Sequence, residues 1–251
     1  MTTLLERPVT LFGDVLLAMV RGLKGGWRFR RQDFLRVLAD ASARATLIVL
    51  IVNILVGAII AFVGAVQLMK FGAGVYVADL VAIAISREMA AVITAVVMSG
   101  RTGAAFAAEL ATMQANEEID ALKVLGLDPV DFLVMPRVLA LVLMLPLLYL
   151  FACVGGLLGG FAVSASLLHL PSAVYFDRSL MALTYTHLGL GFSKSIIFGL
   201  LIAMAGCYYG LFAKRNAEGV GQATTQAVVT GIVGIIALDA VFAVCANALG
   251  I

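Results

Sequence analysis

Two adjacent charged residues, Arg87 and Glu88, lie near the middle of a mainly apolar stretch at residues 76–99. A charged side chain at the centre of a membrane costs about 2.5–3.5 kcal/mol on insertion scales, so each needs a partner or a wet cavity. There, the guanidinium of Arg87 could bind a phosphate group, and the carboxylate of Glu88 could orient that guanidinium or drive release. Adjacent residues of a helix do not face one another, so we expect each to need a further neighbour. A binding site in a membrane cavity and a purely structural ion pair between helices both fit this pattern.

Three further carboxylates lie in apolar or small-residue surroundings and could partner Arg87. Asp79 lies towards the outer end of the same stretch, Glu109 follows a run of alanine and glycine, and Asp239 lies in the stretch 226–249. Because a charge inside a membrane is usually paired, we regard them as possible intramembrane charge partners. A structural ion pair is the alternative for each of them.

The segment at residues 116–125 reads as a short, capped helix in a loop. Asn116 is a good N-cap, acidic residues suit the first turn, and Gly126 followed by Asp128-Pro129 is a stop signal. Its apolar residues fall on or near one face, which is typical of a helix that docks into a groove of another protein. Packing on its own chain is the alternative. The residues assigned to this contact are Glu117, Glu118, Ile119, Asp120, Leu122 and Lys123.

The sequence lacks the motifs of several common enzyme classes. No lysine follows a glycine, so there is no GxxxxGK[ST] loop, and any ATP hydrolysis must come from another subunit. There is also no GxSxG elbow and no HExxH pair. His169 and His187 lack the cysteine or carboxylate spacing of a metal site, so we predict no metal. The chain is therefore expected to be non-catalytic.

The composition predicts a membrane protein. Of the 251 residues, 63% are hydrophobic and 13% are charged, and the mean hydropathy is +1.08. The net charge of +2 is too small to suggest nucleic-acid binding. Because about 20 apolar residues suffice to cross the hydrocarbon core, we predict an all-α integral membrane protein with a helix in each of five apolar stretches. These spans are residues 45–69, 76–99, 136–165, 193–213 and 226–249.

The distribution of lysine and arginine predicts the orientation of the spans, because these residues accumulate in cytoplasmic loops. With a cytoplasmic N-terminus, most of them lie on the cytoplasmic side, including those in the first 44 residues. Only Lys70, Arg178 and Lys194 then fall on the outer side. We therefore predict that the C-terminus also lies on the outer side.

Two segments lie outside the predicted spans. Residues 1–44 are expected to form a cytoplasmic or interfacial helical segment ahead of a transmembrane domain at 45–251, because apolar residues recur there near helical spacing beside several arginines. We expect an amphipathic helix along the cytoplasmic leaflet, with a helix docked on a partner as the alternative. Residues 169–192 have a mixed composition and could form a short helix or a loop that contacts a partner.

Several short motifs follow one another from about residue 40 to the C-terminus. They are Arg87-Glu88-Met89, Ser99-Gly100-Arg101-Thr102-Gly103-Ala104-Ala105, Ala108-Glu109-Leu110, the Glu117–Leu122 segment, Gly126-Leu127-Asp128-Pro129, Pro136-Arg137, Ala223-Thr224-Thr225 and Leu238-Asp239. As an ordered set, these motifs resemble the MlaE (YrbE) permease family. The resemblance implies the membrane-spanning permease subunit of an ABC transporter.

The resemblance also implies partners and a substrate. It implies a homodimer in the bacterial inner membrane, with a periplasmic C-terminus, that moves phospholipid and serves outer-membrane asymmetry. The expected partners are a cytoplasmic ABC ATPase, which binds ATP and Mg, a STAS-domain protein on that ATPase and a periplasmic hexamer of MCE-domain subunits. No cofactor is expected in this chain. Arg87 and Glu88 would lie on the lipid pathway, and residues 116–125 would form the coupling helix.

Two functions of other classes fit the same residues. A secondary transporter could relay protons through Glu88 and Asp239, and a non-transporting protein could act as a scaffold of an envelope complex. Transport that depends on an ATPase favours the ABC permease, whereas transport driven by a pH gradient favours the proton-coupled carrier.

Overall fold

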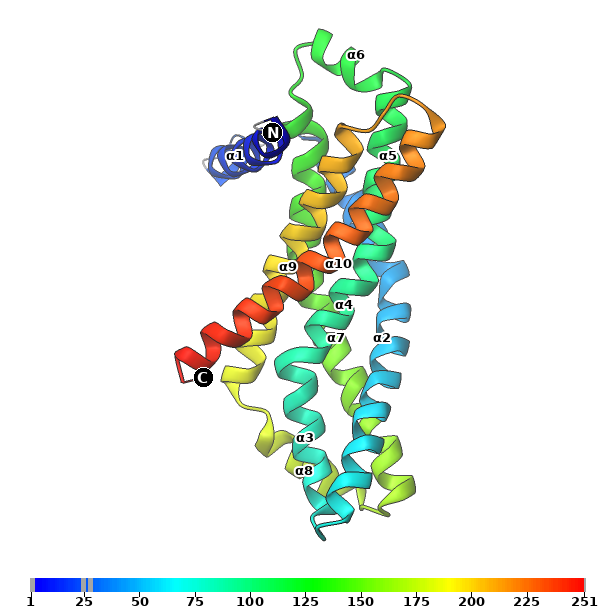
Figure 1. Ribbon diagram of the computed structural model, residues 1–251, viewed down its shortest axis with the longest axis vertical. Coiled ribbons are helices and arrows are strands. Elements are labelled where there is room, and N and C mark those ends of the chain that lie inside the picture. The colour runs from blue at the N-terminus through cyan, green and yellow to red at the C-terminus, as the bar shows by residue number, and fades with distance from the viewer. Residues whose placement is uncertain (1–2, 24–25, 27–28, 251) are drawn as a thin grey trace. The chain divides into compact units, whose positions relative to one another are not determined.

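The computed structural model describes residues 3–23, 26 and 29–250, and helices form nearly all of the secondary structure there (Figure 1). The α-helices are α1 (Thr3–Leu23), α2 (Arg31–Met69), α3 (Val77–Ala84), α4 (Ala90–Met98), α5 (Ala104–Ala115), α6 (Glu118–Val124), α7 (Met135–Leu167), α8 (Ser172–Ala182), α9 (Tyr185–Leu211) and α10 (Ala217–Ala248). A 3-10 helix, η1 (Gly74–Tyr76), precedes α3. The π-helical turns are η2 (Ile85–Met89), η3 (Ser99–Gly103) and η4 (Val130–Val134).

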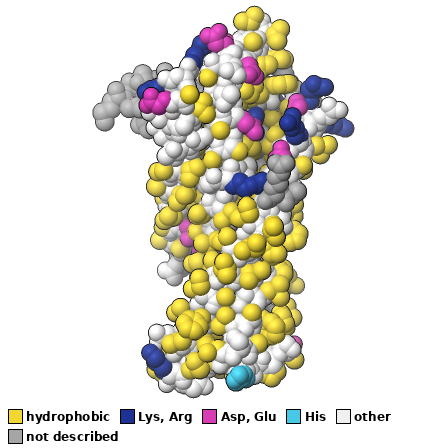
Figure 2. Space-filling view, turned by 90° about the vertical axis from the view of Figure 1, so that its right-hand side faces the viewer, with side chains coloured by type: hydrophobic (Ala, Val, Ile, Leu, Met, Phe, Trp, Pro, Cys, Tyr) yellow, Lys and Arg dark blue, Asp and Glu magenta, His cyan; other side chains and the backbone are white. Residues whose placement is uncertain are grey.

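Five helical stretches among the described residues are long and apolar enough to cross a membrane. They are Arg31–Met69, Gly74–Ala115, Val130–Leu167, Tyr185–Leu211 and Ala217–Ala248. Each overlaps one predicted span, so the predicted all-α fold with five spans is confirmed. The face shown in Figure 2 is covered mainly by hydrophobic side chains, as expected for a surface that contacts acyl chains.

Most of these helices are longer than the apolar stretches that predicted them. The first begins at Arg31 and not at residue 45, so it runs through the boundary expected at residue 44. Hydropathy detects only the part of a helix that lies in the hydrocarbon core, whereas backbone hydrogen bonds continue into the polar residues beyond it. The second stretch is also less regular than predicted, because the π turns η2 and η3 interrupt it.

The chain folds into two compact units, each assembled from three segments. The first unit contains Met1–Ser42, Met98–Met144 and Phe198–Ile235. The second unit contains Ala43–Val97, Leu145–Ile197 and Ile236–Ile251.

In the second unit, α2 and α7 approach each other closely at glycines. A Cβ atom at Gly57 would overlap the backbone of Gly156, and one at Gly159 would overlap the backbone of Ile54. Residues without a side chain at such positions allow transmembrane helices to pack backbone against backbone. These glycines therefore fix the packing of the helix pair.

The helix α8 provides the structure of the segment that the sequence left open. Tyr175 is fully buried, its hydroxyl donates a hydrogen bond to the Leu157 carbonyl at 3.1 Å, and burial raises the pKa of its phenol to about 12. Arg178 forms an ion pair with Asp79 at 2.8 Å and covers the ring of Tyr76. These contacts hold α8 against α3 and α7 within the second unit, so the segment is a docked helix.

In the first unit, α1 packs on the turn η4. Leu11 and Val15 are buried, and the guanidinium of Arg21 contacts both carboxylate oxygens of Asp131 at 3.3 Å. Val9 and Leu17, on the remaining surface of the helix, are exposed. A helix is thus present where the sequence predicted one, and its position along the cytoplasmic leaflet stays a prediction.

Candidate functional site

The pair Arg87 and Glu88 lies in the π turn η2, between α3 and α4. A π turn widens the helix locally, and such turns occur frequently at functional sites. The Nε atom of Arg87 lies 3.7 Å from the Oε1 atom of Glu88, which is ion-pair distance but too long for a hydrogen bond. The two side chains therefore form no hydrogen-bonded bridge, as expected for adjacent residues, and Glu88 has a further partner.

The main partner of Glu88 is Lys194, a residue of α9 that the sequence did not single out. The ammonium of Lys194 binds a carboxylate oxygen of Glu88 and the Oδ1 atom of Asp239, the latter at 2.9 Å. The Lys194 side chain is 1% exposed, whereas those of Glu88 and Asp239 are 27% and 25% exposed. All three belong to the second unit, and we call Arg87, Glu88, Lys194 and Asp239 the intramembrane charge cluster.

The charge cluster brings together two cations and two carboxylates. The ammonium of Lys194 lies between two carboxylates, so removal of either carboxylate would leave the lysine with one acid. The guanidinium of Arg87 brings the formal charge of the four side chains to zero. The cluster is thus electrically balanced, and the partly exposed side chains of Arg87, Glu88 and Asp239 are the ones that a bound group could reach.

Lys194 was predicted to fall on the outer side of the membrane, at the start of the span expected at residues 193–213. In the structure α9 already begins at Tyr185, so Lys194 lies within the helix, and its side chain is buried. The buried position could have been suspected only from the helical continuation to Tyr185.

The three carboxylates proposed as partners of Arg87 each pair with another cation. Asp79 pairs with Arg178 at 2.8 Å, Asp239 pairs with Lys194 at 2.9 Å, and Glu109 pairs with Arg137 at 2.9 Å. Asp239 therefore joins the charge cluster through the lysine. The ion pairs of Asp79 and Glu109 fit the alternative of a purely structural role, because each joins one helix to another.

The loop helix α6 lies in the first unit, after α5 (Figure 1). Gly126 follows it with φ of +74°, and the Leu127 amide donates to the Leu122 carbonyl at 3.0 Å, so the predicted stop is confirmed. The predicted N-cap was wrong, because Asn116 ends α5 and Glu117 caps α6. Glu117 has φ of +60°, a left-handed conformation that is uncommon outside glycine.

The apolar residues of α6 divide into buried and exposed ones. Ile119 is 2% exposed and therefore packs within its own unit. Val124 and Leu125, at the end of the helix, are 88% and 73% exposed. An apolar tip of this kind is the part of the loop that a partner could cover, whereas Ile119 anchors the helix.

Arg215, in the connection between α9 and α10, contacts the start of α6. Its guanidinium binds the carboxylate of Asp120 and lies 3.4 Å from a carboxylate oxygen of Glu117. The hydrogen bond from Lys123, together with Arg215, lowers the pKa of Asp120. The stabilisation from these ion pairs is therefore fully present above the ordinary pKa of an aspartate. It is lost only as the pH falls through the lowered pKa of Asp120.

Arg215→Ala should loosen the start of α6, because it removes the contacts that hold Glu117 in its left-handed conformation. Exposed ion pairs are weak, so we expect amide hydrogen exchange across residues 116–120 to rise by about twofold to fivefold. Hydrogen-exchange mass spectrometry of wild type and variant measures this change. Lys214→Ala is the matched control, since its ammonium makes no ion pair within the described residues, and equal exchange in the two variants would remove the assigned role of Arg215.

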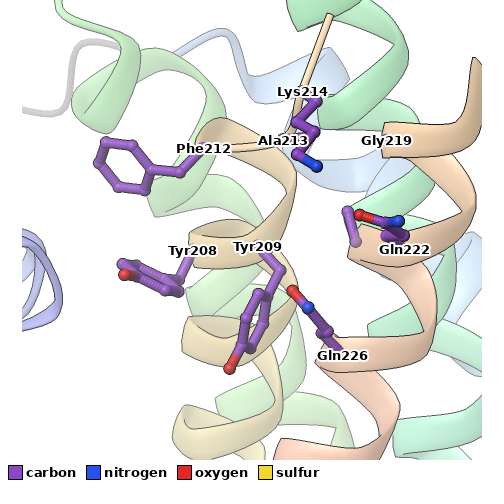
Figure 3. Close-up of a pocket in the computed structure, with 9 residues that line it drawn as sticks. Tyr208, Tyr209, Phe212, Ala213, Lys214, Gly219, Gln222 and Gln226 are labelled. Carbon is purple, nitrogen blue, oxygen red and sulfur yellow. The ribbon is translucent and has the colours of Figure 1, made fainter. Parts of the chain in front are cut away.

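A cavity of about 350 Å³ lies between the end of α9 and the start of α10 (Figure 3). Tyr208 and Tyr209 from α9 line it, together with Phe212 and Lys214 from the turn that follows, and the Tyr209 hydroxyl lies 2.9 Å from the hydroxyl of Thr230. Aromatic and lysine side chains gather where transmembrane helices leave the hydrocarbon core. The lining of the cavity thus has the composition typical of a membrane interface.

Five apolar helical stretches with a buried charge cluster define a multi-pass α-helical membrane protein. The family model described as Permease MlaE matches residues 34–245, and the chain therefore belongs to the MlaE permease family. It is an ABC transporter permease of that family.

Three relatives illustrate the similarity. A probable ABC transporter permease protein of Synechocystis sp. is 36% identical over 228 residues, which cover 90% of this chain and 84% of the relative. A probable ABC transporter permease protein of Rickettsia typhi is 36% identical over 72% of this chain and 70% of its own length. Protein TRIGALACTOSYLDIACYLGLYCEROL 1, chloroplastic, of Arabidopsis thaliana is 34% identical over 90% of this chain and 63% of its own length.

Proposed function

We propose that this chain forms the membrane pathway of an ABC transporter that moves phospholipid or a related lipid between the inner membrane and a periplasmic MCE-domain partner. The observation that carries the proposal is the ammonium of Lys194, buried among membrane-spanning helices and bound by Glu88 and Asp239. Ionisable groups in such a place mark substrate pathways by default. A relative in Arabidopsis thaliana is named after a galactolipid, which supports a lipid substrate.

The charge cluster suggests how a headgroup is received. A lipid phosphate replaces a carboxylate beside Lys194 or Arg87, and the released carboxylate turns towards the wetter side of the cluster. In both arrangements each cation keeps an anion, and the displaced carboxylate carries its charge on the wetter side of the cluster. Binding and release are then exchanges of a carboxylate for a phosphate beside the same cation.

The proposed assembly contains two copies of this chain, because closed twofold dimers are the commonest oligomers and one five-span subunit leaves little room for a lipid cavity. An ABC ATPase, which binds ATP and Mg, contacts α6 on the cytoplasmic side. A STAS-domain protein bound to that ATPase and a periplasmic MCE-domain hexamer complete it. The chain lies in the bacterial inner membrane, with its N-terminus cytoplasmic and its C-terminus periplasmic, and the whole system maintains outer-membrane asymmetry.

The coupling contact is tested with Val124→Asp combined with Leu125→Asp. Both residues are exposed at the tip of α6, so the charges should leave the fold intact but disrupt an apolar contact with the ATPase. We expect ATPase co-purification to fall by about tenfold or more, and ATP-dependent lipid transfer in proteoliposomes to fall with it. Membrane abundance should stay at the wild-type level.

Phe71→Asp is the matched control, because Phe71 is equally exposed at 82% but lies in the turn after the first span. It should retain both the ATPase and lipid transfer. Full ATPase association in the α6 double variant would refute the coupling role. Lipid transfer that ignores ATP but follows a pH gradient would refute the ABC mechanism in favour of a carrier that uses Glu88 and Asp239.

A further inference from the structure

Tyr149, a residue of α7, is fully buried in the second unit, which also contains the charge cluster. Its hydroxyl donates a hydrogen bond to the carbonyl of Ser86 at 2.7 Å and lies 3.4 Å from the carbonyl of Leu188. Ser86 directly precedes the charged pair in η2, and Leu188 lies in α9, the helix that carries Lys194. One buried hydroxyl thus contacts the backbone of two elements that carry the cluster.

The backbone of η2 explains why Ser86 needs this donor. In a regular α-helix the amide of Ala90 would bind the carbonyl of Ser86, four residues earlier. In η2 that amide binds the carbonyl of Ile85, five residues earlier, so the Ser86 carbonyl loses its α-helical donor. A buried carbonyl needs a donor, and the Tyr149 hydroxyl supplies one. The hydroxyl therefore stabilises the π turn at this place in the helix.

The place of the π turn decides where the charged side chains point. Successive residues of an α-helix are rotated by about 100°, because 3.6 residues make a turn. A π turn holds one residue more than an α turn, so a shift of η2 along the helix would rotate the side chains that it passes by about that angle. Glu88 binds the ammonium of Lys194 in the present position of the turn and would then point away from it.

The helix α9 approaches the same hydrogen bond through a glycine. A Cβ atom at Gly191 would overlap the Ser86 carbonyl and the Tyr149 hydroxyl. Gly191 lies about one turn before Lys194. The hydrogen bond that stabilises η2 therefore lies at the contact between η2 and the helix of the lysine.

We propose that Tyr149 is a positioning residue of the charge cluster, whose hydroxyl keeps η2 in the register in which Glu88 reaches Lys194. It acts through the backbone of Ser86, by an uncharged group, and adds no charge to the cluster. Its effect on transport rests on the proposed function, in which a lipid phosphate replaces a carboxylate beside a cation of the cluster. Its effect on the pairing of Lys194 does not rest on that function and is measured separately.

The test uses Tyr149→Phe in the full chain, purified from membranes in the assembly that it forms and placed in lipid nanodiscs. Phenylalanine keeps the packing of the ring and removes the hydroxyl. Reductive dimethylation with formaldehyde and a borane reagent is followed by mass spectrometry at Lys194, relative to the exposed Lys70. The wild-type Lys194 should react slowly, because its side chain is 1% exposed and bound by two carboxylates.

Tyr149→Phe is expected to raise the relative labelling rate of Lys194 by about tenfold, the factor that corresponds to one lost hydrogen bond. ATP-dependent lipid transfer by the same variant in proteoliposomes should fall by about the same factor, because Glu88 no longer lies beside the lysine.

Tyr175→Phe is the matched control. Tyr175 is also fully buried in the second unit, and its hydroxyl also donates to a backbone carbonyl, that of Leu157. The control variant loses the same group and should lower the Tm about as much as Tyr149→Phe. It should leave the labelling of Lys194 and lipid transfer at the wild-type level.

A pair of glycine variants tests the same contact from α9. Gly191→Ala keeps the Tyr149 hydroxyl but forces η2 and α9 apart, so it should act like Tyr149→Phe in both measurements. Gly189→Ala should act like wild type, since a Cβ atom there meets nothing within 4 Å.

Two results would overturn the positioning role: equal labelling of Lys194 in wild type and Tyr149→Phe, or an equal rise in Tyr175→Phe. The second result would mean that labelling reports only a general loss of stability. A rise confined to Tyr149→Phe with undiminished lipid transfer would support the positioning role and refute the pathway role of the charge cluster. The failure of this proposal is thus distinguishable from the failure of the proposed function.

Discussion

Lys194→Met is expected to reduce the abundance of the protein in the membrane severely and to abolish lipid transport. Methionine fills the space of the lysine stem but leaves Glu88 and Asp239 as two carboxylates without the cation between them. Removing one partner of a buried ion pair typically costs about 3–5 kcal/mol, because the remaining charge is uncompensated. Quantitative immunoblotting of membranes and an ATP-dependent lipid-transfer assay measure the two effects.

A neutral triple variant separates a structural role of the cluster from a functional one. Glu88→Gln, Lys194→Met and Asp239→Asn together remove every charge of the lysine network, so abundance should recover. Transport should stay absent, because the variant keeps no carboxylate that can exchange with a phosphate headgroup. Lys70→Met, which removes an exposed lysine, is the control and should change neither quantity.

Transport at the wild-type level in the triple variant would show that the cluster only holds helices together. The same two measurements on Arg87→Ala extend the test, since that side chain is partly exposed and should matter more for transport than for abundance. A loss of protein equal to the loss of transport in Arg87→Ala would instead assign it to the structural pair.

The spans were predictable from the sequence, whereas the partners inside them were not. Hydropathy reports how much apolar sequence is available, and this decides how often the chain crosses the membrane. It carries no information about which helix faces which, so Asp79 and Glu109 could not be assigned to Arg178 and Arg137 before the structure. Lys194 was missed for the same reason, because nothing in the sequence shows that Glu88 and Asp239 face it.

The loop helix α6 shows the same division between local and tertiary information. Gly126 ends the helix through its own backbone conformation, so local sequence sufficed to predict that end. At the other end Glu117 adopts a left-handed conformation beside Arg215, a contact from a distant part of the chain. Likewise, periodicity placed Ile119 on the apolar face of the helix. It could not decide whether that face is covered by the same unit or by a partner.

Gly159→Ala is expected to destabilise the protein by about 1–3 kcal/mol or more, although it adds only one methyl group. The new Cβ atom would overlap the backbone of Ile54 in α2, and a backbone cannot turn aside as a flexible side chain can. The two helices must therefore move apart and lose the contacts that their close approach provides. Thermal unfolding of the purified protein in detergent measures the loss as a lower Tm.

Gly189→Ala is the matched control, because Gly189 lies in α9, in the same unit, and a Cβ atom there would meet nothing within 4 Å. Alanine is a better helix former than glycine by about 1 kcal/mol, so this variant should be neutral or more stable than wild type. The two identical substitutions are thus expected to act in opposite directions. If both change the Tm equally, the stability of the second unit does not depend on the backbone contact between α2 and α7. If only Gly159→Ala lowers the Tm, Gly159 is required because no side chain fits at its contact with α2. Helix propensity alone would favour alanine at both positions.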